Sequence, residues 1–374
     1  MGKTIAINPS WYWPDEIPRL LGVPPFFCER LIAERWARRR PDVVAVVDEE
    51  RSLTYAELWS RAQAIAKQLG ERPETERLVL CGPLGVEGLL ELVGALTARR
   101  RAVLLAPGGE DPCGAAAGSK VADVHEPALE LLSAEGILAG HSHYSLLSGA
   151  LSLGAFLGLQ EPRAWLSAMP LWSWEGLYGA LVPLYAGATA ILCGDPQGAT
   201  DAIAHAVDEH AAAYALAPFE MLRELTRGRP RRLADSIKRN LDGLILSTER
   251  PFAAGDRRKA RKALDVPILT TFGLTETGPI LASHPSWYVD ESVGIPVTNV
   301  EVQPANPQTG EPLDTNWELL DHASMVIRAP QLMAGYAGAA AEDERLSARM
   351  RDGWFETWAL ASFDANGMMY LVDG

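Results

Sequence analysis

Strand-like and helix-like segments alternate along most of this chain, and that alternation constrains the fold more than any other feature. Short apolar runs such as "VVAVV", "RLVLCGP" and "RAVLLAP" have the length of buried strands, and segments of helical periodicity separate them. The alternation resumes further along the chain in "AWLSAMPL", "TAILCGD", "YALAPFEM", "LDGLILST" and "PILTTFGL". Strands that alternate with helices predict parallel sheets whose faces are covered by helices.

After about residue 290, strand-like segments no longer alternate with helix-like ones, and the sequence indicates short strands separated by turns. We therefore predict an α/β fold of two helix-covered, mostly parallel sheets over residues 27–289. A small β-rich, barrel-like subdomain is expected over residues 290–374, and an N-terminal extension over residues 1–26. Ser52 or Thr54 is predicted to cap the helix that carries "YAELWSRAQAIAKQL".

Composition excludes several classes of partner. The formal net charge of −14 disfavours nucleic acid and anionic lipid, because both require clustered lysine and arginine. No stretch reaches the roughly 18 apolar residues that a membrane span requires. The four cysteines are scattered without the spacing of metal ligands, which indicates reduced thiols and a cytoplasmic protein without a metal site. They are Cys28, Cys81, Cys113 and Cys193.

Six segments together resemble the large N-terminal domain of the adenylate-forming superfamily, which includes acyl-CoA synthetases, nonribosomal-peptide adenylation domains and luciferases. They are "SLTYAELWSRA", "MPLWSWEGLYGALVPLYAGATAIL", "TTFGLTETGPI", "VGIPVTNVEV", "VIRAPQLMAGY" and "GWFETWALASFDANG". The third, an aromatic-Gly-x-Thr-Glu loop, is the most diagnostic. The resemblance covers about residues 27–374 and implies that the chain lacks the C-terminal swinging domain of that superfamily.

The resemblance also implies a chemistry, in which a carboxylate reacts with ATP to give an acyl-adenylate that is passed to a thiol. In the superfamily a Ser/Thr/Gly-rich loop wraps the phosphates with backbone N–H groups. A Thr-Glu pair, here Thr275 and Glu276, contacts phosphate and Mg²⁺. An aspartate in the last motif holds the ribose, and a lysine of the C-terminal domain neutralises charge during adenylation.

Of these four elements of the superfamily's site, this chain keeps only the Thr-Glu pair. The stretch "EPALELLSA" runs straight into Glu135 and Gly136, where a phosphate loop and then a lysine are expected. The ribose aspartate is replaced by Ala359, and its glycine neighbour by Trp358. Losing a carboxylate that accepts hydroxyl groups costs roughly 1.5–3 kcal/mol per hydrogen bond. The positions of this degenerate nucleotide site are Glu135, Gly136, Thr248, Glu249 and Ala359.

The segment that walls the acyl pocket in the superfamily remains long and aromatic in this chain. It predicts either an apolar slot for an acyl or aryl group or a closed core that fills the same space. The candidate substrate-binding residues are Trp172, Ser173, Trp174, Phe272 and Gly273. The pair His141 and His143 is predicted to lie on different faces of a helix, exposed or hydrogen-bonded, and not to form a metal or base site.

Three functions compete at this point. The favoured hypothesis is a family member that does not adenylate, binds an acyl or aryl group, and acts with an acyl carrier protein or a partner enzyme. It predicts no cofactor, and Thr275 and Glu276 as remnants of a catalytic pair. The second hypothesis is an AMP-forming acid–thiol ligase, using ATP and Mg²⁺, that another subunit or a longer chain completes. The third is a scaffold without a small ligand.

Overall fold

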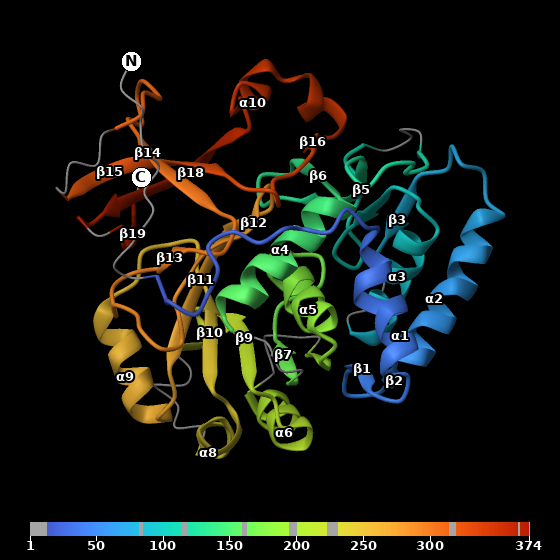
Figure 1. The fold of residues 1–374 in the computed structure, drawn as a ribbon, viewed down its shortest axis with the longest axis horizontal. Coiled ribbons are helices and arrows are strands. Elements are labelled where there is room, and N and C mark those ends of the chain that lie inside the picture. Colours follow the sequence, from blue (N-terminus) through green and yellow to red (C-terminus); the bar gives the residue numbers. More distant parts are fainter. Residues whose placement is uncertain are drawn as a thin grey trace.

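The computed structural model describes residues 13–81, 85–113, 118–158, 163–193, 200–222, 231–313, 319–365 and 367–373. In these residues the chain forms three sheets with helices packed between and around them (Figure 1). Residues 1–12 of the predicted N-terminal extension and Gly374 lie outside the described residues.

The largest sheet has nine strands, and its central six strands, from β11 to β1, run parallel. The antiparallel strands β12, β13 and β2 extend it at its two ends. In spatial order the strands are β13 (Ile295–Pro296), β12 (Gly278–Ala282), β11 (Ile268–Leu274), β10 (Gly243–Ser247), β9 (Tyr214–Pro218), β7 (Trp165–Ser167), β8 (Ala190–Leu192), β1 (Val44–Val47) and β2 (Ser52–Thr54).

The second sheet has five strands and a buried charge network. Its order is β16 (Gly335–Tyr336), β6 (Leu138–Ser142), β5 (Pro127–Leu132), β4 (Ala102–Leu104) and β3 (Leu78–Leu80). Strands β3, β4 and β5 are parallel, and β6 and β16 are antiparallel. Glu130 of β5 is buried and pairs with Arg77 and Arg101, so its charge is compensated inside the sheet.

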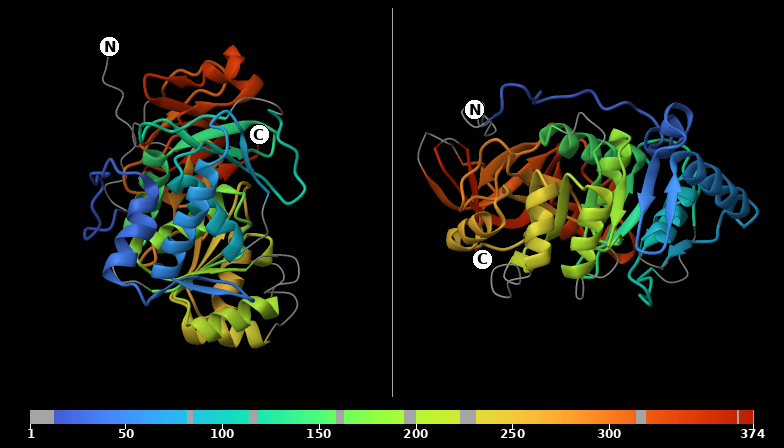
Figure 2. Two further views of the ribbon diagram at one scale, coloured as in Figure 1. Left: turned by 90° about the vertical axis from the view of Figure 1, so that its right-hand side faces the viewer. Right: turned by 90° about the horizontal axis from the view of Figure 1, so that it is seen from below.

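Four helices fill the space between these two sheets, and three others cover the opposite face of the nine-stranded sheet (Figures 1 and 2). The inner helices contribute apolar side chains to one continuous core with strands of both sheets. They are α2 (Tyr55–Gly70), α3 (Val86–Thr97), α4 (His143–Phe156) and α5 (Trp174–Ala186). The outer helices are α6 (Thr200–His210), α8 (Arg231–Asn240) and α9 (Ala254–Leu264).

Local capping explains where two of the inner helices begin. Thr54, one of the two predicted capping residues, accepts a hydrogen bond from the backbone N–H of Glu57 at 3.2 Å, and the Glu57 carboxylate accepts one from the Thr54 N–H at 2.8 Å. Ser142 and Ser145 form the same reciprocal pair at the start of α4. These bonds satisfy N–H groups that a helix cannot pair internally.

The third sheet is antiparallel and lies at the C-terminal end of the chain. It contains β14 (Glu301–Ala305), β15 (Leu320–Arg328), β18 (Trp354–Phe363) and β17 (Met350–Arg351) in that order, with β19 (Met369–Val372) also paired to β18. Short helical segments complete the description: Arg30–Glu34, α1 (Arg35–Arg39), Gly338–Glu342 and α10 (Glu344–Ser347). The predicted fold class, two helix-covered and largely parallel sheets with a β-rich unit, is confirmed.

Residues 13–26 cross the molecule as an extended strap, drawn in dark blue (Figure 2, right). Thr298 donates to the carbonyl of Pro18, and the Asn299 N–H donates to the carbonyl of Arg19 at 2.8 Å. These contacts join the strap to the turn before β14. Within the described residues, no helix combines the length and apolar character needed to cross a membrane.

Candidate functional site

The Thr-Glu loop joins β11 to β12 and is held from several sides. A bulge at Phe272 and Gly273 opens the β11–β12 pairing just before it. The Thr277 hydroxyl accepts a hydrogen bond from the Leu274 N–H at 3.0 Å, which closes the turn. The Met333 N–H donates to the carbonyl of Glu276 at 2.8 Å. The loop is therefore tied to its own strands and to the segment that precedes β16.

His141 ties the same loop to the second sheet, and its position corrects a prediction. His141 belongs to strand β6 and not to a helix, while His143 begins α4; both are buried. Burial lowers the pKa of each imidazole to about 4, so both are neutral near pH 7. The His141 Nε2 lies 2.6 Å from the carbonyl of Thr275 and therefore carries the proton that it donates.

The turn between β5 and β6 occupies the place where a phosphate loop is expected, and it is short. The Ser133 N–H donates to the Ile137 carbonyl at 2.8 Å, the Gly136 N–H donates to the Ser133 carbonyl at 3.0 Å, and the Ile137 N–H donates to the Ser133 hydroxyl at 3.3 Å. Gly136 adopts a φ of +78°, which a glycine tolerates without strain. Three of the backbone donors in this turn are thus used within it.

These two turns, the turn after β10, the end of β11 and strand β18 line a partly open cavity of about 180 Å³. The structure thereby brings together residues from both predicted sets, including the remnant pair, Phe272 and three positions of the nucleotide site. Three glutamates line the cavity, and no lysine, arginine or histidine does. The lining residues are Ser133, Ala134, Glu135, Glu249, Phe272, Leu274, Thr275, Glu276, Trp358 and Ala359.

Acidic side chains dominate the electrostatics of this cavity, since no basic side chain lines it. Glu276 is only 3% exposed, and burial, followed by the charge of Glu135, raises the pKa of its carboxyl. Burial and then Glu135 also raise the pKa of Glu249. The Arg349 guanidinium lies 3.2 Å from the centre of the Trp358 ring, outside the set of lining residues. A polyanion entering this cavity would therefore meet repulsion.

The predicted substrate-binding residues do not line this cavity, apart from Phe272. Trp174 is 3% exposed and packs in the inner core, whereas Phe272 belongs to a separate cluster with the third sheet. A Cβ on Gly273 would stand 2.1 Å from the Gly278 carbonyl oxygen and 2.9 Å from Trp174, so the indole packs directly against this glycine. Trp174 therefore fills a closed core, which is one of the two alternatives predicted for this segment. An open slot beside the half-buried Trp172 stays a prediction.

Two other predicted site residues have local structural roles. The Ser173 hydroxyl caps α5 by accepting from the Gly176 N–H at 3.1 Å. Thr248 is buried, and its hydroxyl donates to the Arg250 carbonyl at 2.8 Å within the turn after β10. Neither side chain lines the acidic cavity.

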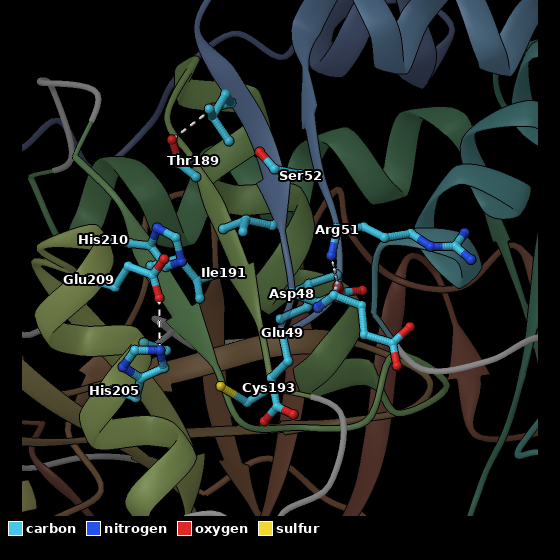
Figure 3. Close-up of a pocket in the computed structure, with 15 residues that line it drawn as sticks. Asp48, Glu49, Arg51, Ser52, Thr189, Ile191, Cys193, His205, Glu209 and His210 are labelled. Atoms are coloured by element: carbon cyan, nitrogen blue, oxygen red, sulfur yellow. Dashed lines mark hydrogen bonds and ion pairs between the residues drawn. The ribbon is translucent and has the colours of Figure 1, made fainter.

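A larger groove of about 580 Å³ lies at the far end of the nine-stranded sheet, and the sequence did not reveal it (Figure 3). Its walls come from the β1–β2 turn, β8 and α6, which are distant in the chain. His205 pairs with Glu209 at 3.0 Å on α6. Burial and then Glu49 raise the pKa of Cys193 to about 12, so this thiol is not nucleophilic near pH 7. The described residues contain no cluster of metal ligands.

Comparison with known proteins agrees with the geometry. The family model described as "AMP-binding enzyme" matches residues 139–337, more than half of the chain. The chain belongs to the AMP-binding enzyme family. The match covers most of β6, the Thr-Glu loop and β16, whereas the β5–β6 turn and β18, which also line the acidic cavity, lie outside it.

Curated relatives of this AMP-binding family member are named as CoA ligases. The 2-succinylbenzoate–CoA ligase of Bacillus subtilis is 25% identical over 238 residues, which cover 63% of this chain and 44% of that protein. The 4-coumarate–CoA ligase-like 9 of Arabidopsis thaliana is 34% identical over 121 residues, 31% of this chain and 20% of the relative. The matched part of the chain thus spans less than half the length of these relatives.

Solved structures show the same fold. A long-chain-fatty-acid–CoA ligase of Archaeoglobus fulgidus superposes with a TM-score of 0.78 at 14% identity, covering 96% of this chain and 86% of that one. The O-succinylbenzoate–CoA synthetase of Bacillus subtilis in complex with AMP gives a TM-score of 0.75 at 18% identity, covering 94% and 78%. At these identities the likeness establishes the architecture alone.

Proposed function

We propose that this chain is a member of the AMP-binding family that does not form acyl-adenylates by itself. The observation that carries the proposal is the lining of the cavity at the Thr-Glu loop. Glu135, Glu249 and Glu276 surround the space, and no basic side chain lines it. Phosphate groups need N–H donors and positive charge, and here they would meet three carboxyl groups.

The short β5–β6 turn supports the proposal independently. A phosphate-binding loop directs its backbone N–H groups outward to the ligand. In this turn the N–H groups of Ser133, Gly136 and Ile137 are bonded within the turn. At Ala359, where the resemblance places the ribose carboxylate, the side chain offers no acceptor. The combined loss of these contacts corresponds to more than about 5 kcal/mol, or over a thousandfold in affinity.

The volume of the cavity also argues against nucleotide binding. Sites for small organic ligands usually enclose roughly 300–1,000 Å³. The acidic cavity encloses about 180 Å³, and the Trp358 side chain forms part of its wall. A nucleotide would need space that this indole and the Glu135 turn occupy.

One alternative keeps a specific observation in its favour. The Thr275–Glu276 loop is held firmly by His141 and Met333, and the curated relatives are named as CoA ligases. In this second candidate function the chain is part of an AMP-forming ligase, and another subunit or a longer chain supplies the missing groups. It uses the acyl or aryl slot beside Trp172 and requires ATP and Mg²⁺.

Pyrophosphate exchange tests whether the chain alone forms acyl-adenylates. The chain is incubated with ATP, Mg²⁺ and labelled pyrophosphate, together with 2-succinylbenzoate, a coumarate or a long-chain fatty acid. The Bacillus subtilis 2-succinylbenzoate–CoA ligase serves as the positive control. We expect no acid-dependent exchange above background with any of these acids. Acid-dependent exchange by the chain alone would refute the proposal.

A further inference from the structure

The groove between the β1–β2 turn and α6 has the volume of a site for a small organic ligand (Figure 3). It measures about 580 Å³ and is partly open to solvent, and such sites usually enclose roughly 300–1,000 Å³. Strands β1 and β2 end the nine-stranded sheet on one side, whereas β11 and β12, which carry the Thr-Glu loop, lie near the other. A ligand in the groove would therefore be separate from the acidic cavity and independent of the proposed function.

The floor of the groove is apolar and shielded from solvent. Val47 of β1 is 5% exposed, Ile191 of β8 is 1% exposed, and Cys193, which follows β8, is 4% exposed. The sulfur of Cys193 points toward α6 in Figure 3, and in the described part of the chain its thiol has no hydrogen-bond partner. An apolar ligand body on this floor would displace the remaining water and contact the thiol, which is favourable.

One wall of the groove is the β1–β2 turn, and Asp48 fixes its shape. The Oδ1 of Asp48 accepts from the N–H groups of Glu50 and Arg51 at 2.9 and 2.8 Å. Its Oδ2 accepts from the Val86 N–H at 2.7 Å, which ties the turn to the start of α3. A wall that is already ordered reduces the entropy that is lost when a ligand binds.

The charged side chains around the groove leave negative charge without a partner. Arg51 pairs with Glu87, which is not part of the lining. Glu49 is exposed on the turn and has no ion pair in the described part of the chain. Glu209 of α6 pairs with His205 at 3.0 Å, which is an ion pair only when the imidazole is protonated. Each of the two walls therefore presents a carboxylate beside the apolar floor.

This combination selects one class of ligand. An anion would be repelled by the carboxylates. A metal ion does not suit the groove, because no three of the described histidines, cysteines, aspartates and glutamates are placed to hold one. A small inorganic cation would also gain nothing from the apolar floor. The class that uses both the floor and the walls is an organic cation with an apolar body.

We propose that this groove binds an amphipathic organic cation of the arylalkyl ammonium class. Its apolar body lies on Val47, Ile191 and Cys193, and its ammonium group is directed toward the carboxylates of Glu49 and Glu209. The body contributes to affinity through the apolar area that it buries. The ammonium group contributes through charge-assisted hydrogen bonds from its three N–H donors.

The test is a calorimetric titration of the chain with 2-phenylethylammonium chloride at low ionic strength. We expect one saturable site with a dissociation constant of about 0.1–1 mM, as a ligand of so few heavy atoms allows. The neutral analogue 2-phenylethanol and the anion 3-phenylpropionate should each bind at least fivefold more weakly. Methylammonium, which keeps the charge and lacks the apolar body, should bind at least tenfold more weakly.

Matched variants locate the site. Ala206→Trp places a large side chain in the groove and should weaken 2-phenylethylammonium binding at least tenfold. Glu49→Gln and Glu209→Gln, both at exposed side chains, should each weaken it at least threefold, and they decide the question if Ala206→Trp does not fold. Glu249→Gln, which removes an exposed carboxyl of the acidic cavity, should leave binding unchanged.

Absence of saturable binding, equal binding of methylammonium, or unchanged binding in both groove glutamine variants would overturn the inference. Weaker binding in Glu249→Gln alone would place the ligand in the acidic cavity and would overturn it as well. None of these outcomes changes the expected result of pyrophosphate exchange, so the proposed function is tested separately.

Discussion

At the scale of single residues, His141 couples the Thr-Glu loop to the second sheet and makes stability depend on pH. Its pKa is about 4 in the folded chain and ordinarily about 6.5, so the folded state binds fewer protons between these values. The free energy of unfolding should fall as pH drops from 6.5 to 4, by on the order of 3 kcal/mol for this side chain. Urea unfolding of the wild type and His141→Gln at pH 7, 5.5 and 4.5 measures it. An equal loss in both proteins would contradict this prediction.

Glu29 should make the free energy of unfolding depend on pH in the opposite direction to His141. Burial raises the pKa of its carboxyl to about 7 from about 4.5, and its Oε2 lies 3.6 Å from the Nδ1 of the neutral His143. The stability that its protonated form supplies is complete below pH 4.5 and is lost as pH rises through 7. Glu29→Gln should therefore match the wild type near pH 4.5 and exceed its unfolding free energy at pH 8 by on the order of 3 kcal/mol. Urea unfolding at the two pH values tests it, and equal stability at pH 8 would contradict it.

The two neighbouring tryptophans of the predicted acyl slot should respond differently to truncation. Trp174 is buried against Gly273, whereas Trp172 is only partly buried. Trp174→Ala should lower the free energy of unfolding by about 3–5 kcal/mol, and Trp172→Ala by clearly less. Denaturant unfolding of both variants gives the comparison. A loss below about 1 kcal/mol in Trp174→Ala would indicate that this indole borders open space.

At the scale of secondary-structure elements, Arg257 of α9 holds the helix against the strands that carry the Thr-Glu loop. Its guanidinium is buried and donates to the carbonyls of Ile268, Val289 and Ser292 and to the Ser283 hydroxyl, at 2.6–3.1 Å. Burial lowers its pKa to about 10, so it remains charged at pH 7.

Truncating this arginine should be costly because its partners would be left unsatisfied. Arg257→Ala should lower the free energy of unfolding by about 3–5 kcal/mol. Arg258→Ala, the next residue on the same helix, removes only exposed ion pairs with Asp290 and Glu291 and should cost under about 1 kcal/mol. Thermal or urea unfolding of the two variants measures this difference. Similar losses of unfolding free energy in both variants would contradict the role assigned to Arg257.

The sequence predicted elements better than it predicted the contacts between them. Apolar runs such as Gly243–Ser247 identify buried strands, and the ends of neighbouring strands bring the family motifs together. The strand that contains His141 could not be recognised, because its pairing with β5 is set by a turn and not by periodicity. The direction of the Trp174 side chain and the groove between the β1–β2 turn and α6 depend on packing between distant segments, which no local pattern records.

At the scale of the whole molecule, the chain has the architecture of its family, and the proposed function requires an altered site within it. The sheets place β5–β6, β11–β12 and β18 around one point, as the shared fold requires. We propose that the chemistry at that point differs. Glu135 and Ala359 stand where the resemblance places a cation and a ribose acceptor, so the same scaffold encloses an acidic cavity with an aromatic wall.

The most direct test of this account is calorimetric titration of the chain with ATP and Mg²⁺. The account predicts a dissociation constant weaker than about 1 mM. It also predicts that Ala359→Asp alone does not restore binding, because the β5–β6 turn would still offer no cradle for the phosphates. A micromolar dissociation constant for the wild-type chain would contradict the central claim.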